Sequence, residues 1–391
     1  MIKRVFSVLK NNAMVVALAA VMVLFQVWIV ATNHGSLFSP MNASNVILQN
    51  AYVIILAVGM LLCIISSGNI DLSVGSIVVL VGAVVGTLVV NMHLPVWIGI
   101  VAGLLLGVLI GAWQGFWIAY VRIPAFIVTL AGMLLFRGLA LIVLNGLTIS
   151  PFPELFQKIF AGYVPEGASQ GSAFIPTAIV TAIACVVFAV TQIVGRARQK
   201  KAGAAVGSEI IFWAKLLCLV ALVAIFGLLL GQHKGIPTVL ILIVVIIAVY
   251  SYITQKTVPG RHLYAMGGNE KAAKLSGINT NRMLLAVYTS MGLLSAVAAL
   301  VCCARFNSAA PSAGDGYELD AIASCYIGGA SAFGGTGKVS GAVIGALFMG
   351  VLNIGMSIVG IDANWQKAVK GFVLLAAVVF DVLSKRQASA E

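Results

Sequence analysis

Two charged side chains stand inside long apolar stretches of the sequence, where an unpaired charge would be costly. Asp71 lies in the segment SSGNIDLSVGS, and Arg137 lies in LLFRGLALIV. Buried charges in proteins are normally paired, because an isolated ion loses its hydration. We therefore predict that Asp71 and Arg137 form a structural ion pair. The glycine and serine residues around Asp71 also predict a break between two helices.

No residues are spaced for catalysis, nucleotide binding or metal binding. The segment GGTGKVS (Gly334–Ser340) is similar to a phosphate-binding loop, but the full pattern needs glycine at Ala332 and Ser or Thr at Val339. Ser331 has no histidine clearly placed as its base, because the four histidines fall in loops or at the ends of apolar runs. The six cysteines show no metal-type spacing. We expect no enzyme activity, no metal site and no cofactor bound by this chain.

The longest polar segment between apolar runs is GRHLYAMGGNEKAAKLSGINTNR, Gly260–Arg282. Within it NEKAAKL favours a helix, with Gly267 and Gly268 before it and Gly277 after it as flexible ends. We predict a short helix over Asn269–Leu275. Connections are usually about 4 to 6 residues long, so the length of this one favours docking of a partner over a plain solvated connector.

Around these residues the chain is strongly apolar. Of its 391 residues, 61% are hydrophobic and 9% are charged, and its mean hydropathy is +1.10. Soluble domains are only about 45 to 50% apolar, and so few charges cannot cover a soluble surface. The apolar runs are each close to the about 20 residues that span a bilayer as a helix, which predicts an all-α polytopic membrane protein with about 11 to 12 transmembrane helices. The net charge of +12 does not indicate nucleic-acid binding, because the basic residues stand between the apolar runs.

The basic residues also indicate the orientation of the helices. With a cytoplasmic N-terminus, and with Tyr317–Gly335 counted as a half-helix or short tilted crossing, most Lys and Arg residues face the cytoplasm. The residues left on the outer side are Lys158, Lys234, Arg305 and Lys367. This asymmetry follows the positive-inside rule. We predict that both termini are cytoplasmic.

Two stretches resemble each other in glycine spacing. One is GLLLGVLIGAWQGFWIAYVRIPAFIVTLAG from Gly103, and the other is GAVIGALFMGVLNIGMSIVGIDANWQKAVKG from Gly341. They run in opposite directions in the predicted topology, which predicts an inverted-repeat core, although glycine recurs in membrane helices for packing alone. We treat residues 1–391 as a single transmembrane domain. Residues 151–231 are predicted to be an inserted helix pair with an external segment before it, and residues 260–282 form the cytoplasmic loop.

Several long blocks resemble the permeases of ribose, xylose and galactose ATP-binding cassette (ABC) importers. They are SSGNIDLSVGS, RIPAFIVTLAGMLLFRG, GGNEKAAKLSGI and the block from Phe306 to Met356. The extra spans at 151–231 make the chain most similar to the xylose or multiple-monosaccharide branch. The resemblance implies a homodimer in the cell inner membrane that receives a monosaccharide, a xylose-like pentose or a hexose, from a periplasmic sugar-binding protein. It also implies that ATP is bound by a separate ATPase subunit.

The resemblance assigns a role to the cytoplasmic loop. In these permeases the loop carries a coupling helix that enters a cleft in the ATPase. The contact positions implied here are Gly267, Gly268, Asn269, Glu270, Ala272, Ser276 and Gly277.

A sugar also needs neutral hydrogen-bonding groups and an aromatic face along its path, such as a broken helix provides. The candidates for lining this path are Asn69, Ser73, Gln114, Phe126, Asn307 and Asn353. Each polar member also fits the simpler role of bridging two helices, and direct sugar contact is the alternative to the ion pair for Asp71. The family often has Asn-Asn-Gly where this chain has Asn353, Ile354 and Gly355, so only one amide is present there.

A secondary carrier, driven by protons or sodium, is the main alternative. Such a carrier needs titratable groups within its spans. Only Asp71, Asp320 and Asp381 compete for that role, which is few for a proton relay.

Overall fold

The structure is a computed structural model that describes residues 13–167, 171–203 and 208–390. The first half of the chain forms α2 (Ala13–Ala31), α3 (Pro40–Ser67), α4 (Val74–Gly86), the π-helical η1 (Thr87–Asn91), α5 (Val96–Ala119) and α6 (Ala125–Leu144). A middle region forms α7 (Glu154–Ala161), β1 (Tyr163–Val164), α8 (Phe174–Lys201), α9 (Glu209–His233) and β2 (Ile236–Pro237). The remainder forms α10 (Thr238–Lys256), α11 (Val258–Gly268), α12 (Glu270–Leu275), α13 (Thr280–Phe306), α14 (Tyr317–Ile327), α15 (Val339–Val359) and α16 (Ala363–Ala390).

The protein is an all-α polytopic membrane protein, as the sequence predicts. Within the described ranges, ten helices are long and apolar enough to cross a membrane. The helix α16 and the short α14 lie beside this set. The helices α5, α6, α8, α9 and α10 expose many large apolar residues, which suits a surface in contact with lipid.

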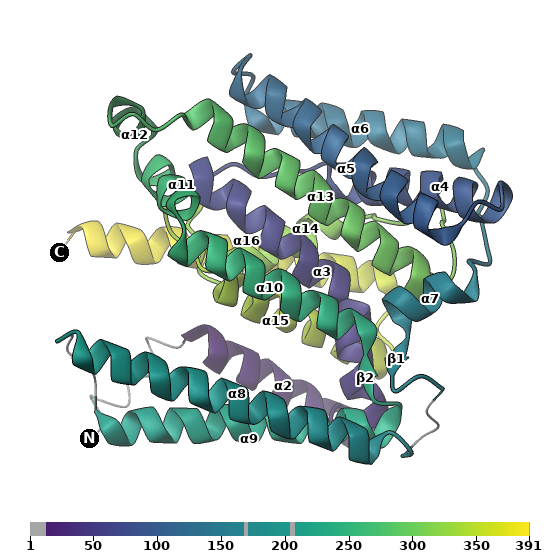
Figure 1. Cartoon of the computed structure of the whole chain (residues 1–391), viewed down its shortest axis with the longest axis vertical. Helices are drawn as coiled ribbons and strands as arrows, with labels where there is room; N and C mark the ends of the chain where they lie inside the picture. Colours follow the sequence, from purple (N-terminus) through teal and green to yellow (C-terminus); the bar gives the residue numbers. More distant parts are fainter. Residues whose placement is uncertain (1–12, 168–170, 204–207, 391) are drawn as a thin grey trace.

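The long helices run between two ends of the molecule (Figure 1). At one end lie α11 and α12, together with the basic residues Arg198, Lys200 and Lys201 that close α8. At the other end lie α7 and the two-stranded antiparallel sheet, in which Tyr163 pairs with Pro237. In the predicted topology the first end is cytoplasmic and the second is external. The predicted cytoplasmic N-terminus falls on residues 1–12, which lie outside the described residues.

The helix α3 is the centre of the bundle. It begins at Pro40, where the Ser39 side chain accepts a hydrogen bond from the Asn42 amide, and it ends at Gly68, whose φ of 69° stops the helix. Almost every residue from Asn50 to Ser66 is buried. The helices α9, α10, α11, α13, α14 and α15 pack against it.

Glycine brings α5 and α13 into the tightest helix pair of the structure. A Cβ atom added at Gly107 would lie 2.5 Å from the carbonyl oxygen of Gly292, and one added at Gly292 would collide with the carbonyl of Gly107. One turn along, a Cβ at Gly111 would strike the backbone of Tyr288 and Thr289. Small residues let helix backbones approach in a bilayer, where packing contacts replace the hydrophobic effect. We call this unit the α5–α13 pair.

The two halves of the molecule repeat one arrangement with opposite direction. The helices α3, α4, α5 and α6 correspond to α13, α14, α15 and α16, because α5 packs on α13 as α15 packs on α3. In the same way α4 packs on α6 and α14 on α16. The helices α3 and α13 lie side by side and run antiparallel (Figure 1). The contacts therefore agree with the predicted inverted repeat.

Each half contains one broken element. Residues 68–73 lead into α4, and residues 307–316 lead into α14. At about 1.5 Å per residue the 11-residue α14 rises only about 16 Å, against about 30 Å of hydrocarbon. The piece Tyr317–Gly335 is therefore a half-helix. The two breaks meet where Gly75 touches Gly314, since a Cβ on either glycine would collide with the carbonyl oxygen of the other.

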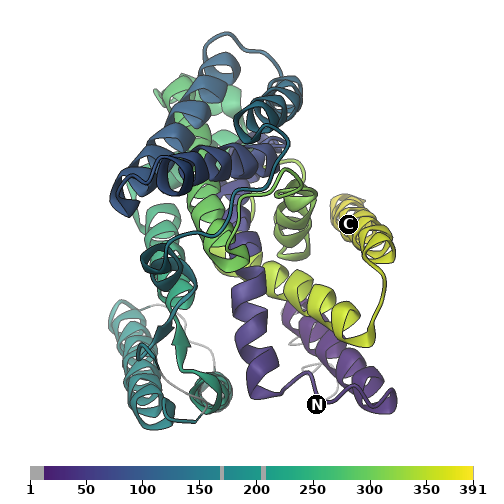
Figure 2. The same cartoon turned by 90° about the vertical axis from the view of Figure 1, so that its right-hand side faces the viewer.

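The helices α8 and α9 form a pair at the edge of the bundle (Figure 2). They pack closely on each other, because Gly227 of α9 lies against Thr181 and Gly231 lies against Thr177 of α8. The helix α9 also packs on α3. Most other side chains of α8 are exposed, which suits a pair surrounded by lipid.

Candidate functional site

The segment after α10, predicted to be cytoplasmic, forms two short helices, α11 and α12. Asn269 separates them and caps α12, because its Oδ1 accepts a hydrogen bond of 3.0 Å from the Ala272 amide. The helix ends where the Ser276 hydroxyl donates to the Ala272 carbonyl and Gly277 takes a φ of +84°. The short helix expected over Asn269–Leu275 is thus present with its cap.

The segment is held to the body through its inner face. Leu263 and Met266 of α11 and Ala273 of α12 are buried. The Tyr264 hydroxyl donates a 2.7 Å hydrogen bond to the Gly337 carbonyl, and burial raises the pKa of Tyr264, so it remains a donor. A side chain at Gly267 would collide with the Ile65 carbonyl. Gly267 is therefore a contact with the chain's own α3 and not an open surface position.

The outer face of α12 is open. Among the residues predicted to contact a partner, Gly268, Asn269, Ala272, Ser276 and Gly277 are exposed. Sequence reasoning missed Leu275, which is 90% exposed at the end of α12. Leu275 stands beside the exposed Lys271 and Lys274, so the open face of α12 is not wholly polar. The only feature of the sequence that could have pointed to Leu275 is that it is an apolar residue in a polar segment.

Glu270, the remaining predicted contact, is half-buried and faces inward. Its Oε1 accepts a hydrogen bond of 2.7 Å from the Arg122 guanidinium. Arg122 belongs to the turn between α5 and α6, and it also donates to Asn281 and to Thr280 at the start of α13. Arg122 therefore joins α12 to the turn between α5 and α6 and to the start of α13.

A buried polar cluster lies at the start of α4. The Ser73 amide and hydroxyl donate to Asp71 Oδ1 over 2.9 and 2.6 Å, and Gln114 Nε2 of α5 donates to Ser73 Oγ over 2.7 Å. Asp71, Ser73 and Gln114 are all fully buried. Nearby, Asn69 is partly exposed and donates to Ser67 Oγ. The structure thus links three of the predicted residues, Asp71, Ser73 and Gln114, in one hydrogen-bonded chain.

The predicted ion pair between Asp71 and Arg137 is wrong. Arg137 donates from one guanidinium nitrogen to the carbonyls of Pro311 and Ala313, over 3.3 and 2.8 Å. Residues 311–316 form turns before α14, and the guanidinium of Arg137 satisfies two carbonyls of this non-helical segment. Asp71 Oδ1 accepts from Ser73 two residues along, while Asp71 Oδ2 is buried without a hydrogen-bond partner in the described structure.

The other candidates for the path lie apart from this cluster. Phe126, near the start of α6, is 56% exposed. Asn307 ends α13 with a φ of 52°, and its Oδ1 accepts from the Phe152 amide, so it fixes the external connection. Asn353 is half-buried on α15, and its Oδ1 has no partner within the described structure.

A second buried carboxylate lies in the other half. Asp320 Oδ2 of α14 accepts from the Tyr52 hydroxyl of α3 over 2.9 Å and from Lys370 Nζ of α16 over 3.1 Å. The ring of Tyr52 stacks on Tyr317 with 3.8 Å between centroids. The sequence marked Asp320 only as a titratable residue in a span. Its partners lie on distant helices, which the sequence does not reveal.

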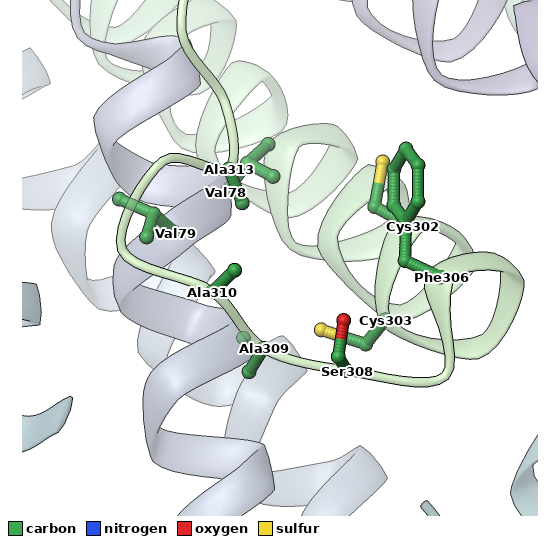
Figure 3. Close-up of a pocket in the computed structure, with 10 residues that line it drawn as sticks. Val78, Val79, Cys302, Cys303, Phe306, Ser308, Ala309, Ala310 and Ala313 are labelled. Atoms are coloured by element: carbon green, nitrogen blue, oxygen red, sulfur yellow. The ribbon is translucent and has the colours of Figure 1, made fainter. Parts of the chain in front are cut away.

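A small pocket lies between α4, the end of α13 and the lead-in at 307–316 (Figure 3). Its lining is mostly apolar, and Figure 3 shows Cys303 and Ser308 on one side with Val79 and Ala310 on the other. With so few hydrogen-bonding groups it does not suit a sugar. We interpret it as a packing gap beside the break.

The end of the molecule predicted to be external carries a charged cluster on and just after α7. Lys158 Nζ lies 2.8 Å from Glu154 and 2.7 Å from Glu166. The hydrogen bond from Lys158 lowers the pKa of Glu154, so this carboxylate stays charged near neutral pH. Within the described residues, no group of three or more His, Cys, Asp and Glu side chains is placed to hold a metal ion.

Comparison with known proteins gives matches along almost the whole chain. The family described as "Branched-chain amino acid transport system / permease component" matches residues 42–378. The xylose transport system permease protein XylH of Escherichia coli (strain K12) is 40% identical over 376 residues, which cover 96% of this chain and 92% of that protein. Its counterpart in Haemophilus influenzae is 39% identical over 376 residues, or 96% of each chain. The ribose import permease protein RbsC of Escherichia coli (strain K12) is 34% identical over 353 residues, covering 90% of this chain and 89% of that protein. No solved structure matches the chain.

Proposed function

The chain belongs to the permease-component family of branched-chain amino acid transport systems, and we propose that it is the membrane-spanning permease subunit of an ABC importer for a monosaccharide. The observation that carries this proposal is the identity of 40% with a xylose permease over 96% of the chain. Although the family description names amino acids, these relatives are named for xylose and ribose. They support a xylose-like pentose or a hexose as the substrate.

The proposed importer has four parts. Two copies of this chain span the cell inner membrane, with both termini of each in the cytoplasm. A periplasmic sugar-binding protein delivers the sugar, and an ABC-type ATPase binds and hydrolyses ATP, so this chain itself is not an enzyme and binds no cofactor. The helix pair α8–α9 is an insertion between the two halves in this proposal.

The cytoplasmic face of α12 is the proposed docking site for the ATPase. Its exposed surface includes Gly268, Asn269, Lys271, Ala272, Lys274, Leu275, Ser276 and Gly277. The position of Gly268 supports this role, because a Cβ there would meet no atom of the chain within 4 Å. A bulky residue at Gly268 is thus compatible with the fold and would obstruct only a partner.

The proposed sugar path passes the polar cluster at the start of α4. Ser73, Gln114 and Asn69 are neutral groups beside a broken helix, as recognition of a hydroxyl-rich solute requires. Gln114 Oε1 is buried without a partner in the described structure, so it can accept a further hydrogen bond. Phe126, Asn307 and Asn353 lie apart from this cluster, and we propose no direct role for them beyond packing.

Reconstitution tests the proposal. Vesicles would contain this chain with its ATPase, ATP inside and labelled xylose or ribose with the binding protein outside. We expect uptake that requires every component and that is lost when Gly268 is replaced by Trp, with membrane insertion unchanged. Replacement of Gly138 by Trp is the matched control, because that glycine also has open space around it.

The opposite results would overturn the proposal. One is uptake by this chain alone, driven by a proton or sodium gradient, which is the behaviour of a secondary carrier. Another is full retention of the ATPase on the Gly268→Trp variant, which would remove α12 as the docking site.

A further inference from the structure

Arg122 occupies an unusual backbone conformation at the turn between α5 and α6. Its φ is +64°, in the left-handed region that residues other than glycine rarely adopt. Strained residues of this kind persist where surrounding contacts hold them, and they cluster at functional positions. The contacts here come from the guanidinium group.

That group is forked between separate helices. Nη1 donates to Glu270 Oε1 of α12 over 2.7 Å, and Nη2 donates to Asn281 and to Thr280 Oγ1 at the start of α13. The planar fork of arginine suits such divided contacts, whereas the point charge of lysine reaches only one side. At the start of the segment RIPAF, Arg122 therefore provides a guanidinium group that can contact α12 and α13 at the same time.

The helix α12 has few other attachments. Only Ala273 of its residues is buried, and α12 packs against α11 and the start of α13 at the tip of the molecule (Figure 1). The α5–α13 pair, by contrast, is locked by glycine-to-backbone contact at Gly107, Gly111 and Gly292. Arg122 thus links a loosely attached helix to the stiffest unit of the bundle.

We propose that Arg122 is a positioning residue that transmits movement of α12 to the α5–α13 pair. This inference rests on the proposed function, because it requires an ATPase that moves α12. A displacement of Glu270 pulls the turn that ends α5 and begins α6, and the contacts at Asn281 and Thr280 make α13 follow. Arg122 does not itself form part of the exposed docking surface described above.

The contact between Arg122 and Glu270 can be removed without a large loss of folding stability. The side chains of Arg122 and Glu270 are 42% and 38% exposed, and ion pairs in contact with solvent contribute little to folding. Removing the guanidinium therefore leaves a folded permease with its exposed docking surface intact. Any change in transport then reports on transmission.

The experiment compares variants in the reconstituted importer of this chain, its ATPase and its sugar-binding protein. The variants are Arg122→Ala, Arg122→Lys and Glu270→Gln, with Arg282→Ala as the matched control because Arg282 is an exposed arginine just beyond Asn281. Three quantities are measured: ATPase retained on the purified permease, ATP hydrolysis, and uptake of labelled xylose or ribose. Monodispersity of each variant in detergent confirms folding.

We expect Arg122→Ala to retain the ATPase within about 2-fold, as loss of an exposed pair implies. Uptake per ATP hydrolysed should fall about 10-fold, within the range of measured couplings between sites. Arg122→Lys and Glu270→Gln should lie between the alanine variant and the wild type, and Arg282→Ala should match the wild type.

Two outcomes would overturn the inference while leaving the proposed function standing. In one, Arg122→Ala transports as much sugar per ATP as the wild type. In the other, uptake and ATPase retention fall in equal proportion, which would make Arg122 a docking residue. A wild-type importer without ATP-dependent uptake would instead overturn the proposed function, and the inference with it.

Discussion

The two halves of the molecule break a helix in the same way but satisfy the buried carboxylate at the break with different groups. In the first half Asp71 accepts hydrogen bonds from Ser73, and Gln114 stands behind that serine. In the second half Asp320 accepts from Tyr52 and from the cation of Lys370. The donors at the first carboxylate are neutral, and the second carboxylate is part of a charge pair. One oxygen of each, Asp71 Oδ2 and Asp320 Oδ1, has no hydrogen-bond partner within the described structure.

The difference indicates different tasks. Neutral donors such as the Ser73 amide and hydroxyl do not require a negative charge on their acceptor. If Asp71 were replaced by Asn, the side-chain amide oxygen could still accept these hydrogen bonds. A carboxylate that faces a lysine cannot be removed without leaving a buried cation. Tyr52 lies on α3 and Lys370 on α16, so the second cluster also ties three helices together. We infer that the second half carries more of the stability and that the first half is freer to change.

The largest expected effect comes from Asp320→Ala. It leaves Lys370 without its partner, and breaking a buried pair costs about 3 to 5 kcal/mol. The Lys370 side chain is 23% exposed, so solvent screens part of the charge and we expect about 3 kcal/mol, at the low end of that range. The measurement is the midpoint of thermal unfolding in detergent.

The double variant Asp320→Ala with Lys370→Met serves as its control. Because it removes the stranded cation, it should recover part of the lost stability. A double variant less stable than Asp320→Ala alone would show that the charge pair is not the source of the effect.

Gly75→Ala tests the point where the two breaks meet. The new methyl group would collide with the carbonyl of Gly314, and overpacking against backbone costs about 1 to 3 kcal/mol. Gly138→Ala in α6 is the matched control, since a Cβ there meets nothing within 4 Å. It should be neutral or slightly stabilising, because alanine favours helix more than glycine does.

Unfolding midpoints of the two variants should therefore separate clearly. Equal midpoints would mean that the contact between the breaks is not tight. In that case the two halves would not constrain each other at Gly75 and Gly314.

The sequence was sufficient where the physical cause is local. Apolar runs predict helices because each run must satisfy its own backbone in lipid, and Asn269 before a helix-favouring stretch predicts the cap of α12. The half-helix at α14 could be anticipated because its apolar piece is short and rich in glycine and serine.

The sequence was insufficient where a partner is distant along the chain. It shows that Arg137 needs a partner, but the carbonyls of Pro311 and Ala313 become its acceptors only through packing of the second break against α6. Asp320 and Lys370 meet for the same kind of reason. Periodicity and composition identify which charges are costly, and the tertiary arrangement decides how each is satisfied.

Arg137→Ala examines a charged link between the halves, which joins α6 to the lead-in at 307–316. Hydrogen bonds from a charged group contribute about 1.5 to 3 kcal/mol, so we expect a loss of about 2 kcal/mol, between the effects of Asp320→Ala and Asp71→Asn. Amide hydrogen exchange should also accelerate in residues 307–316, which lose their anchor. Arg305→Ala is the control, because its contact with the Gln49 carbonyl is longer, at 3.4 Å.

Exchange in residues 307–316 that does not change in Arg137→Ala would contradict this account. The lead-in would then be held by its other contacts, among them the bridge between Ile149 and Ala309, the hydrogen bond from Phe152 to Asn307 and the ion pair of Asp315 with Lys367.

Asp71→Asn should have the smallest effect and is the sharpest test of the comparison. The Asn side-chain oxygen can still accept from the Ser73 amide and hydroxyl, so we expect less than about 1 kcal/mol of lost stability, the scale of one neutral hydrogen bond. Asp71→Ala removes the acceptor and leaves those donors unpaired, which costs about 1 to 3 kcal/mol. Unfolding midpoints of both variants, measured beside Asp320→Asn, separate charge from hydrogen bonding. If Asp71→Asn destabilised the protein as much as Asp320→Asn, the first break would depend on a negative charge as the second does, and the contrast between the halves would be lost.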